Sequence, residues 1–388
     1  MNRRTDTVKA TEPRSIAIIA GQLVMGGAER QLSFWLSGLD RTQFSPVVVT
    51  LHPDEGDFWE PRVESLGIPL LRVRRRANRA ARVLDIVRSL RPFRPRLVHA
   101  WHLFASPYGG VAAKLLGADA CLGSLRGSFE SFRKNPLQAR LTLALVDGLL
   151  VNSQAAGDRV ASARRTRKTK IFVVPNAVEN HVGDRSAARR ELGGRFGLDE
   201  GEIWIGSMGR IEKGKRFDLL LDLLASLLRR GERVRLLLIG EGPALASLRV
   251  QAEQLHLGNA VVFAGADPGA RTWLNVLDIF CFASLDEGLP NVVMEAAAAG
   301  VAIVSWKTPF LSELLEHRVS ALLAPPGDVR QLEQAVLELV HDGATRGKLG
   351  GRARTDMLRQ YSVARFLERM TGAYMALLDG AAQGRRGL

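Results

Sequence analysis

A chain of 388 residues can hold two or three domains, and 46% hydrophobic with 24% charged residues is the composition of an ordinary globular protein. The most apolar stretch, Leu141–Val151, contains Asp147 and is too short to span a bilayer, and the polar first fifteen residues lack the apolar core of a signal peptide. Cys121 and Cys281 both fall in expected strands, which favours buried thiols over a disulfide or metal pair and predicts a cytoplasmic protein.

Basic residues are in excess, 54 Lys and Arg against 40 Asp and Glu, and the excess is uneven. Arg72 through Arg96 holds ten arginines and one acid, Asp85. Apolar residues within Ala80–Leu90 share one helical face, which predicts a core-facing helix with a solvated basic side. Attraction to an anionic membrane surface or a lipid phosphate is the alternative. Nucleic-acid binding is disfavoured, because no recognition motif is present and aromatic residues make up only 6% of the chain.

The first elements form a strand, a glycine-containing loop and a helix. The strand is expected at Ser15–Ala20, the loop at Gly21–Gly27 and the helix at Ala28–Leu39, an arrangement in which backbone can approach a ligand closely. The spacing is not G-x-G-x-x-G, so the dinucleotide fingerprint is absent. Helical stretches separate most of the further strands, and this alternation predicts a parallel, doubly wound sheet. The further strands are expected at Pro46–Leu51, Pro69–Val73, Leu97–Ala100, Cys121–Leu125, Gly148–Asn152 and Ile171–Val174.

A second strand–helix series follows a polar stretch without a sustained apolar period. We expect a polar tail at 1–14, an N-terminal domain at 15–180, a linker at 181–201 and a C-terminal domain at 202–360. A terminal helix at 361–380 is expected to pack back on the N-terminal domain, followed by a disordered tail at 381–388. The second set of strands is expected at Ile203–Met208, Val234–Ile239, Val261–Phe263, Ile279–Ala283, Ala302–Ser305 and Ala321–Leu323, and the helices at Phe217–Arg230, Pro243–Leu255, Val329–His341 and Ala344–Gln360.

The segment Gly209–Arg216, GRIEKGKR, fits the phosphate-binding P-loop pattern as far as Lys215. Arg216 then stands where a P-loop needs a hydroxyl to hold Mg²⁺, which disfavours a P-loop NTPase. The alternative is that Arg210 and Lys215 are two cations that converge on a diphosphate and neutralise it without a metal ion. No D-x-D occurs in the chain, in keeping with metal-free chemistry.

The stretch Ser284–Gly300 predicts a binding site built on a helix N-terminus. Pro290 is expected at the first helical position, and the N–H groups of Asn291, Val292 and Val293 are expected to point outward toward a phosphate. Glu295 lies one turn further along the same helical face, where its carboxylate can accept hydrogen bonds from sugar hydroxyls. Glu287 precedes the helix, at the mouth of the same site. An ordinary strand–turn–helix with two solvated glutamates is the competing interpretation.

These motifs together resemble the retaining glycosyltransferases of family 4, which have the GT-B fold. That fold is α/β, with two Rossmann-like doubly wound domains facing each other across a cleft. The resemblance covers nearly the whole chain. The matching segments are, in order, MGGAER (Met25–Arg30), VHAWH (Val98–His102), VNS (Val151–Ser153), VVPNAV (Val173–Val178), GRIEKGK (Gly209–Lys215), LLIGEGP (Leu237–Pro243), VVFAG (Val261–Gly265), EGLPNVVME (Glu287–Glu295) and LLAPPGD (Leu322–Asp328).

The resemblance implies roles for individual residues. Glu295 would bind the nucleotide ribose, Arg210 and Lys215 would hold the diphosphate, and Glu287 would contact hydroxyls of the donor sugar near its anomeric carbon. Fixed cations and helix ends can stabilise the departing nucleoside diphosphate. The remaining donor-binding residues belong to two loops: Gly26, Gly27, Leu289, Pro290, Asn291 and Val292.

The chain departs from the family pattern at three places. Many members carry a histidine after the fifth N-terminal strand, where this chain has Arg126, which cannot act as a base but can bind hydroxyls or phosphate. His102 is then an imidazole candidate for the site, as is His99. The family's proline is replaced by Ala302, and its Gly-Gly turn by Pro309-Phe310, so donor identity does not follow by analogy.

The sequence therefore predicts a metal-independent retaining glycosyltransferase without a cofactor. The donor would be a nucleotide sugar, most often UDP-linked in such families, and the acceptor a glycan or lipid-linked molecule of surface polysaccharide or lipopolysaccharide synthesis. The protein would not bind nucleic acid. A sugar-nucleotide epimerase or a phosphorylase of the same fold, and a P-loop-like NTPase, are the alternatives.

A second basic segment bears on localisation. Phe129, Phe132, Arg133 and Lys134 follow the fifth strand closely, and two rings beside two cations suit a membrane interface. The competing interpretation is that both phenylalanines pack into the core. The membrane interpretation predicts peripheral attachment at the inner face of the plasma membrane.

Overall fold

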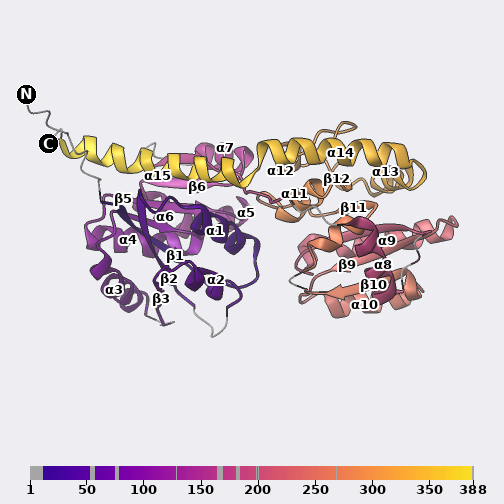
Figure 1. Ribbon diagram of the computed structural model, residues 1–388, viewed down its shortest axis with the longest axis horizontal. Helices are drawn as coiled ribbons and strands as arrows, with labels where there is room; N and C mark the ends of the chain where they lie inside the picture. Colours follow the sequence, from indigo (N-terminus) through magenta and orange to yellow (C-terminus); the bar gives the residue numbers. More distant parts are fainter. Residues whose placement is uncertain are drawn as a thin grey trace, which may run out of the picture. The chain divides into compact units, whose positions relative to one another are not determined.

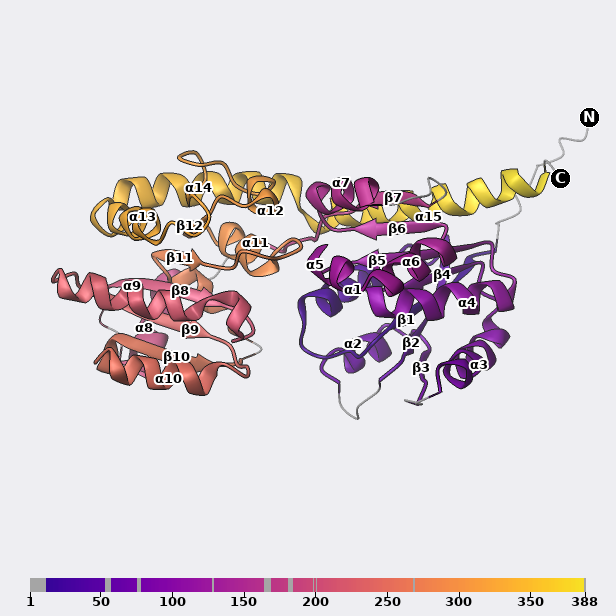
Figure 2. The same ribbon diagram turned by 180° about the vertical axis from the view of Figure 1, so that it is seen from behind.

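The computed structural model describes residues 12–52, 57–74, 78–127, 129–163, 169–180, 184–197, 199, 201–267 and 269–386. The chain divides into two units (Figures 1 and 2). Unit 1 comprises residues 1–152, 156–175 and 366–388, and unit 2 comprises residues 153–155 and 176–365. Each unit is an α/β domain with a parallel sheet, as the sequence predicts.

Unit 1 is built on a seven-stranded sheet in the order β3-β2-β1-β4-β5-β6-β7. Strand β1 pairs with β2 on one side and with β4 on the other, and every pairing in the sheet is parallel. Ile16, Ile18 and Ile19 of β1 are fully buried because helices cover both faces of such a sheet. The strands are β1 Arg14–Ala20, β2 Phe44–Thr50, β3 Leu70–Arg72, β4 Leu97–Ala100, β5 Ala120–Leu125, β6 Gly148–Val151 and β7 Lys170–Val173. The helices are α1 Gly27–Gly38, α2 Glu60–Ser65, α3 Arg79–Leu90, α4 Ser106–Leu116, α5 Phe129–Lys134, α6 Pro136–Leu145 and α7 Gln154–Ala163.

The C-terminal helix, α15 (Val363–Arg386), returns to unit 1 from Phe366 onward. Tyr374 is fully buried and packs edge-to-face against Trp35 of α1, with the ring centroids 5.0 Å apart. Leu377 lies against Gly148 of β6: a Cβ added at Gly148 would be 3.2 Å from Cδ1 of Leu377. The tail expected to be disordered from residue 381 is instead helical as far as Arg386.

Unit 2 is built on a six-stranded parallel sheet in the order β10-β9-β8-β11-β12-β13. Helix α9 buries a continuous leucine face against it, which accounts for one side of the core. The strands are β8 Ile203–Met208, β9 Val234–Ile239, β10 Val261–Gly265, β11 Ile279–Phe282, β12 Ala302–Trp306 and β13 Leu322–Ala324. The helices are α8 Arg185–Phe196, α9 Phe217–Arg229, α10 Leu245–Gln254, α11 Asn291–Ala298, α12 Pro309–Ser312, α13 Val329–His341 and α14 Gly343–Gln360.

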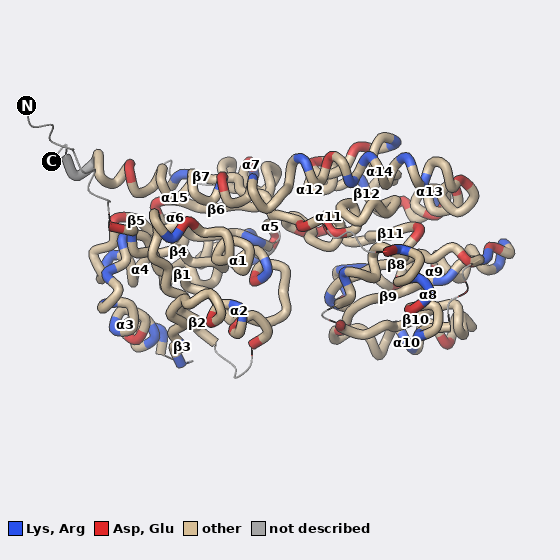
Figure 3. The backbone as a smooth tube through the Cα atoms, viewed as in Figure 1, with Lys and Arg blue, Asp and Glu red and all other residues tan. Residues whose placement is uncertain are grey.

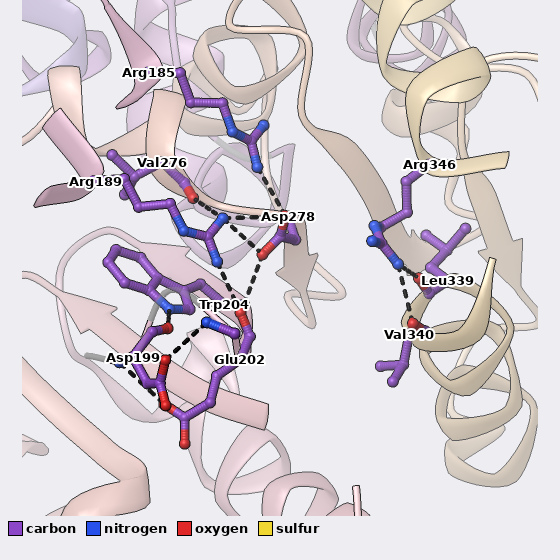
Figure 4. A network of polar contacts seen from close by, with 11 residues as sticks. Arg185, Arg189, Asp199, Glu202, Trp204, Val276, Asp278, Leu339, Val340 and Arg346 are labelled. Atoms are coloured by element: carbon purple, nitrogen blue, oxygen red, sulfur yellow. Dashed lines mark hydrogen bonds and ion pairs between the residues drawn. The ribbon is translucent and has the colours of Figure 1, made fainter. Parts of the chain in front are cut away.

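The stretch expected to be a linker, 181–201, contains helix α8 and belongs to unit 2. Asp184 caps the helix by accepting hydrogen bonds from Ser186 N and Ala187 N. Leu192 is its one fully buried residue, and Arg189 binds Asp278 through both carboxylate oxygens (Figure 4). The prediction was wrong because the apolar face of this helix is short, consisting of Ala188, Leu192 and Phe196 packed on the core, and ion pairs with Asp278 add to its attachment.

The segment expected at a membrane interface is helix α5, and its aromatic rings face the protein. Phe132 is buried in a cluster with Leu125 and Val151, and Phe129 stacks on it at 5.9 Å. Arg133 pairs with Glu130 one turn away. The core interpretation of these phenylalanines is therefore the correct one. Cys121 and Cys281 are buried free thiols, as predicted.

Candidate active site

In unit 2, three loops meet at the carboxyl ends of β8, β9 and β10. Gly209 N donates to Ile239 O, and Gly240 N donates to Gly265 O. Gly240 has a φ of 137°, and a Cβ there would lie 2.0 Å from Gly209 O. Only glycine permits this approach. The motifs that begin with Gly209 and end with Gly265 thus share one edge of the sheet, which is where open parallel sheets bind ligands.

Lys215 and Glu287 are in direct contact at this edge. Lys215 ends a short 3₁₀ turn, η3 (Lys213–Lys215), and its Nζ donates to Glu287 Oε1. Both side chains are partly buried, at 23% and 16% exposed. The structure thus joins the cation expected at the diphosphate with the carboxylate expected at the sugar. The sequence did not predict that these two residues contact each other.

Arg210 and Arg216 lie beside this pair but differ from it in exposure and partners. The Arg210 side chain is 72% exposed, with its Nε 3.9 Å from Glu212 Oε2, so it remains open to a ligand. Arg216 is held in a left-handed conformation, with φ 55°, and pairs with Asp218. Helix α9 begins only after it. A P-loop instead needs a hydroxyl here and a helix beginning at the preceding lysine, so the local geometry disfavours that motif.

Helix α11 begins at Asn291, one residue later than expected, and Pro290 is its N-cap. Leu289 is buried, and its carbonyl accepts a hydrogen bond from Asn176 Nδ2 at 3.0 Å, which holds the loop before the helix. Val293 N donates to Pro290 O, so this N–H group is not available to an anion as predicted. The part of the prediction that concerns Val293 is therefore wrong, and the part that concerns Asn291 and Val292 stays a prediction.

Glu295 lies in the second turn of α11 and is 7% exposed. Arg271, which precedes the 3₁₀ turn η5 (Thr272–Val276), donates from Nε to Glu295 Oε1 at 3.2 Å. Arg271 was not among the predicted residues, because it lies outside every matching motif. Its charge offsets the cost of burying the Glu295 carboxylate.

In unit 1, the loop before α1 lies beside a hydrogen bond between Glu29 and His102. Gly26 is the N-cap of α1, and a Cβ there would lie 2.2 Å from Glu29 Oε2. His102 Nε2 is 3.0 Å from Glu29 Oε1, and Gly21 N donates to His102 Nδ1. Because Nδ1 accepts a hydrogen bond, the ring proton is assigned to Nε2, which donates to Glu29. In this arrangement neither nitrogen of His102 presents a lone pair to a substrate, and the histidine instead ties two loops together. Gly27, also predicted, is the first residue of α1.

Arg126 follows β5 and stacks on Trp101, with its Cζ 3.7 Å from the indole centroid. Trp101 Nε1 donates to Ala28 O in the first turn of α1. Burial lowers the pKa of the Arg126 guanidinium to about 9, offset in part by Tyr374 and Glu29.

His99 is buried between Tyr374 Oη and Ser124 Oγ, each 2.7 Å from a ring nitrogen. Burial lowers its pKa well below 6.5, and the nearby charge of Arg126 lowers it further. His99 is thus a neutral core residue that links α15 to the sheet rather than a group exposed to substrate.

Two family models match the chain, one in each half. Residues 25–181 match Glycosyltransferase Family 4, and residues 189–356 match Glycosyl transferases group 1. The two matches together include every candidate site residue described above.

Individual relatives agree with these models. The chain is 26% identical to the putative glycosyltransferase EpsF of Bacillus subtilis over 81% of this chain and 83% of that protein. It is 30% identical to the lipopolysaccharide core biosynthesis glycosyltransferase LpsE of Rhizobium meliloti over 67% of this chain and 73% of that protein. Among solved structures, Anabaena HepE in complex with UDP and glucose superimposes with a TM-score of 0.80 at 19% identity, covering 92% of this chain and 98% of HepE.

Proposed function

Because the chain belongs to the family 4 and group 1 glycosyltransferases and has the GT-B fold, we propose that it transfers a sugar with retention of configuration from a UDP-sugar. The acceptor is a glycan or a lipid-linked molecule of surface polysaccharide or lipopolysaccharide synthesis. The name of LpsE, which contains lipopolysaccharide core biosynthesis, supports this pathway. The HepE structures, which hold UDP or UDP-glucose, support a UDP-linked donor.

The contact between Lys215 and Glu287 carries the proposal for the donor site. It places a cation and a carboxylate side by side at the carboxyl edge of the unit 2 sheet. A sugar diphosphate has the complementary pattern, since its phosphate is anionic and its adjacent sugar hydroxyls donate hydrogen bonds. Glu295, one helical turn inside α11, would take the ribose hydroxyls. Arg210 would close over the diphosphate from its exposed position.

The chemical step in this proposal needs charge stabilisation more than proton transfer. As the bond from the anomeric carbon to the diphosphate lengthens, negative charge grows on the leaving oxygen. Lys215, Arg210 and the N-terminus of α11 are the groups placed to stabilise that charge. We propose that they do so without a metal ion or a cofactor. Among the residues that the structure describes, no three His, Cys, Asp or Glu side chains gather as metal ligands would.

The basic side of unit 1 supports a proposal for membrane contact. An open hollow of about 930 Å³ is lined by Arg88, Arg91, Arg94 and Arg96, at the ends of α3 and α4 (Figure 3 shows the basic residues on the backbone). Leu84 and Leu115, 48% and 57% exposed, lie on the same two helices. Arginines beside exposed leucines match the phosphates and acyl chains of an anionic bilayer.

We propose on this basis that the protein is cytoplasmic and binds the inner face of the plasma membrane peripherally. No helix in the described part of the chain is both long and apolar enough to cross a bilayer. Arg75 and Arg76, which belong to the predicted basic cluster, lie outside the described residues. The role predicted for Phe129 and Phe132 is not part of this proposal, because both rings pack inward.

A transfer assay tests the proposed function. The protein is incubated with a UDP-sugar and a lipid-linked or oligosaccharide acceptor in the presence of a chelator, and the anomeric configuration of the product is read by NMR. The proposal predicts a product with the donor's configuration and activity that survives the chelator. Inversion would refute the mechanism, and interconversion of free nucleotide sugars without an acceptor would favour an epimerase.

A further inference from the structure

Arg126 lies on an aromatic ring at the carboxyl edge of the unit 1 sheet. Its guanidinium covers the face of Trp101, and the indole N–H of Trp101 donates to Ala28 O in the first turn of α1. The arginine is therefore one indole ring away from a helix N-terminus, which itself carries partial positive charge. Two positive features thus lie close together in a partly buried position.

No carboxylate in the described part of the chain forms an ion pair with Arg126. Its Nη2 reaches Met370 Sδ at 3.9 Å, which is a weak acceptor, and the buried Nε and Nη1 have no hydrogen-bond partner. Glu29, whose charge acts on Arg126, is already hydrogen-bonded to His102. A buried donor without a partner has lost its hydrogen bonds to water and gained none in return, so this arrangement opposes stability.

The chain contains a second arginine stacked on tryptophan, and that one is paired with an acid, although its buried Nε also has no hydrogen-bond partner. Arg189 lies over Trp204 at 4.5 Å, and its Nη1 binds both oxygens of Asp278 while its Nη2 donates to Glu202 O (Figure 4). The two sites share the same cation–ring geometry and differ in the acid. Arg189 thus has the counter-ion of a structural arginine, whereas Arg126 lacks one.

We propose that Arg126 binds an anionic group of the substrate, a carboxylate or a phosphate, that supplies the missing counter-ion. Its planar fork matches either group with two parallel hydrogen bonds. The side chain is partly exposed. The N-terminus of α1 adds to the attraction. The inference rests on the proposed function for the identity of the substrate, though not for the existence of the anion site.

The first test compares stability in Arg126→Met and Arg189→Met. Methionine keeps an apolar stem on each tryptophan and removes the charge. Arg126→Met should leave the melting temperature of the protein alone unchanged or higher, because it removes unpaired buried donors. Arg189→Met should lower it, because Asp278 loses a partner. If Arg126→Met destabilises the protein as much as Arg189→Met does, Arg126 is a structural residue and the proposal is wrong.

The second test measures binding of four probes to the wild type, Arg126→Met and Arg126→Lys by calorimetry: UDP, UDP-glucose, UDP-glucuronate and glycerol phosphate. Arg126→Met should weaken the binding of at least one probe tenfold or more, with partial recovery of affinity in Arg126→Lys. Weaker binding of UDP assigns the anion to the donor diphosphate. Weaker binding of UDP-glucuronate alone assigns it to a sugar carboxylate, and weaker binding of glycerol phosphate alone assigns it to an acceptor phosphate.

Other outcomes separate this inference from the proposed function. If the wild type binds glycerol phosphate through Arg126 but neither UDP nor the UDP-sugars, the proposed donor is wrong and the anion site stands. If the wild type binds the nucleotides and Arg126→Met changes no probe by more than threefold, the anion site is refuted and the proposed function stands.

Discussion

Lys215 donates a hydrogen bond to Glu287, although 72 residues separate them in the chain. The contact brings the end of the η3 turn to the loop before α11, and it neutralises both charges in a partly buried position. A diphosphate bound here would compete with Glu287 for the ammonium. The released carboxylate would then be available to the hydroxyls of the sugar, so donor binding would couple the two residues.

The lysine should govern affinity for the diphosphate. We expect Lys215→Ala to weaken UDP binding by roughly tenfold to a hundredfold, as loss of a hydrogen bond to a charged group does, at about 1.5–3 kcal/mol. Isothermal titration calorimetry measures this directly. Arg216→Ala is the matched control, since Arg216 pairs with Asp218 before α9 and should leave UDP affinity nearly unchanged. Equal losses in both variants would contradict the assignment.

Replacing Glu295 and replacing Glu287 should have different effects on binding and turnover. Glu295→Ala removes a ribose contact that is made in the ground state and the transition state alike, so the Kd for UDP should rise. Glu287→Ala releases Lys215, so UDP affinity should be kept or improved while kcat falls. Comparing the Kd for UDP with kcat in both variants tests this difference. A similar loss of UDP affinity in both would show that Glu287 lies at the nucleotide rather than at the sugar.

The arginine hollow of unit 1 should bind anionic vesicles. Anionic lipid is worth about 1 kcal/mol per basic residue near the surface, so replacing Arg91 and Arg94 by Ser should reduce co-sedimentation with anionic vesicles several-fold. Salt should reverse wild-type binding, because the Debye length falls to about 3 Å at 1 M. UDP affinity should not change in the double variant. If the wild type fails to sediment with anionic vesicles at low salt, the acceptor is soluble and the membrane proposal is wrong.

Burial of His99 should make unit 1 sensitive to acid. Its pKa in the fold is well below the ordinary value of 6.5, so below pH 6.5 the unfolded chain takes up a proton that the folded protein resists. Stability should therefore fall as the pH drops from 6.5 toward the lowered pKa. His99→Gln should show a shallower decline in melting temperature between pH 6.5 and 5.5. Parallel slopes in the wild type and His99→Gln would contradict this account.

The sheets could be predicted from the sequence because their signals are local. Apolar runs give β8 and β9 with the expected bounds, Ile203–Met208 and Val234–Ile239, and the strand–helix alternation predicts their parallel pairing. Helix α8 was not predicted in this way, because its apolar face is limited to Ala188, Leu192 and Phe196. Arg185 and Arg189, both bound to Asp278, supply the rest of its attachment. Hydrophobic periodicity cannot predict the ion pair between Arg189 and Asp278, which are 89 positions apart.

The candidate site shows the same division. The motifs identified Lys215, Glu287 and Glu295 as candidates, and their roles stay predictions. The motifs did not identify the residue that each of them contacts. Arg271 lies outside the motifs, and its bond to Glu295 depends on how the loop after β10 folds. The binding partners of His102 are equally non-local, since Glu29 in the first turn of α1 and Gly21 after β1 are both more than 70 residues away in the chain. A lone histidine after a strand therefore gave no indication that both of its nitrogens are occupied.

Ligand-induced thermal stabilisation tests the central claim most directly. The wild type and Lys215→Ala are heated with a panel of UDP-, GDP- and other nucleotide sugars, and with ATP and Mg²⁺. A ligand at a hundred times its Kd stabilises the folded state by about 2.7 kcal/mol, so binding should be plain as a rise in melting temperature. The account predicts a rise with one or more UDP-sugars in the wild type and a smaller rise in Lys215→Ala. A protein that ignores every nucleotide sugar, but is stabilised by ATP with Mg²⁺ and hydrolyses it, would contradict the account.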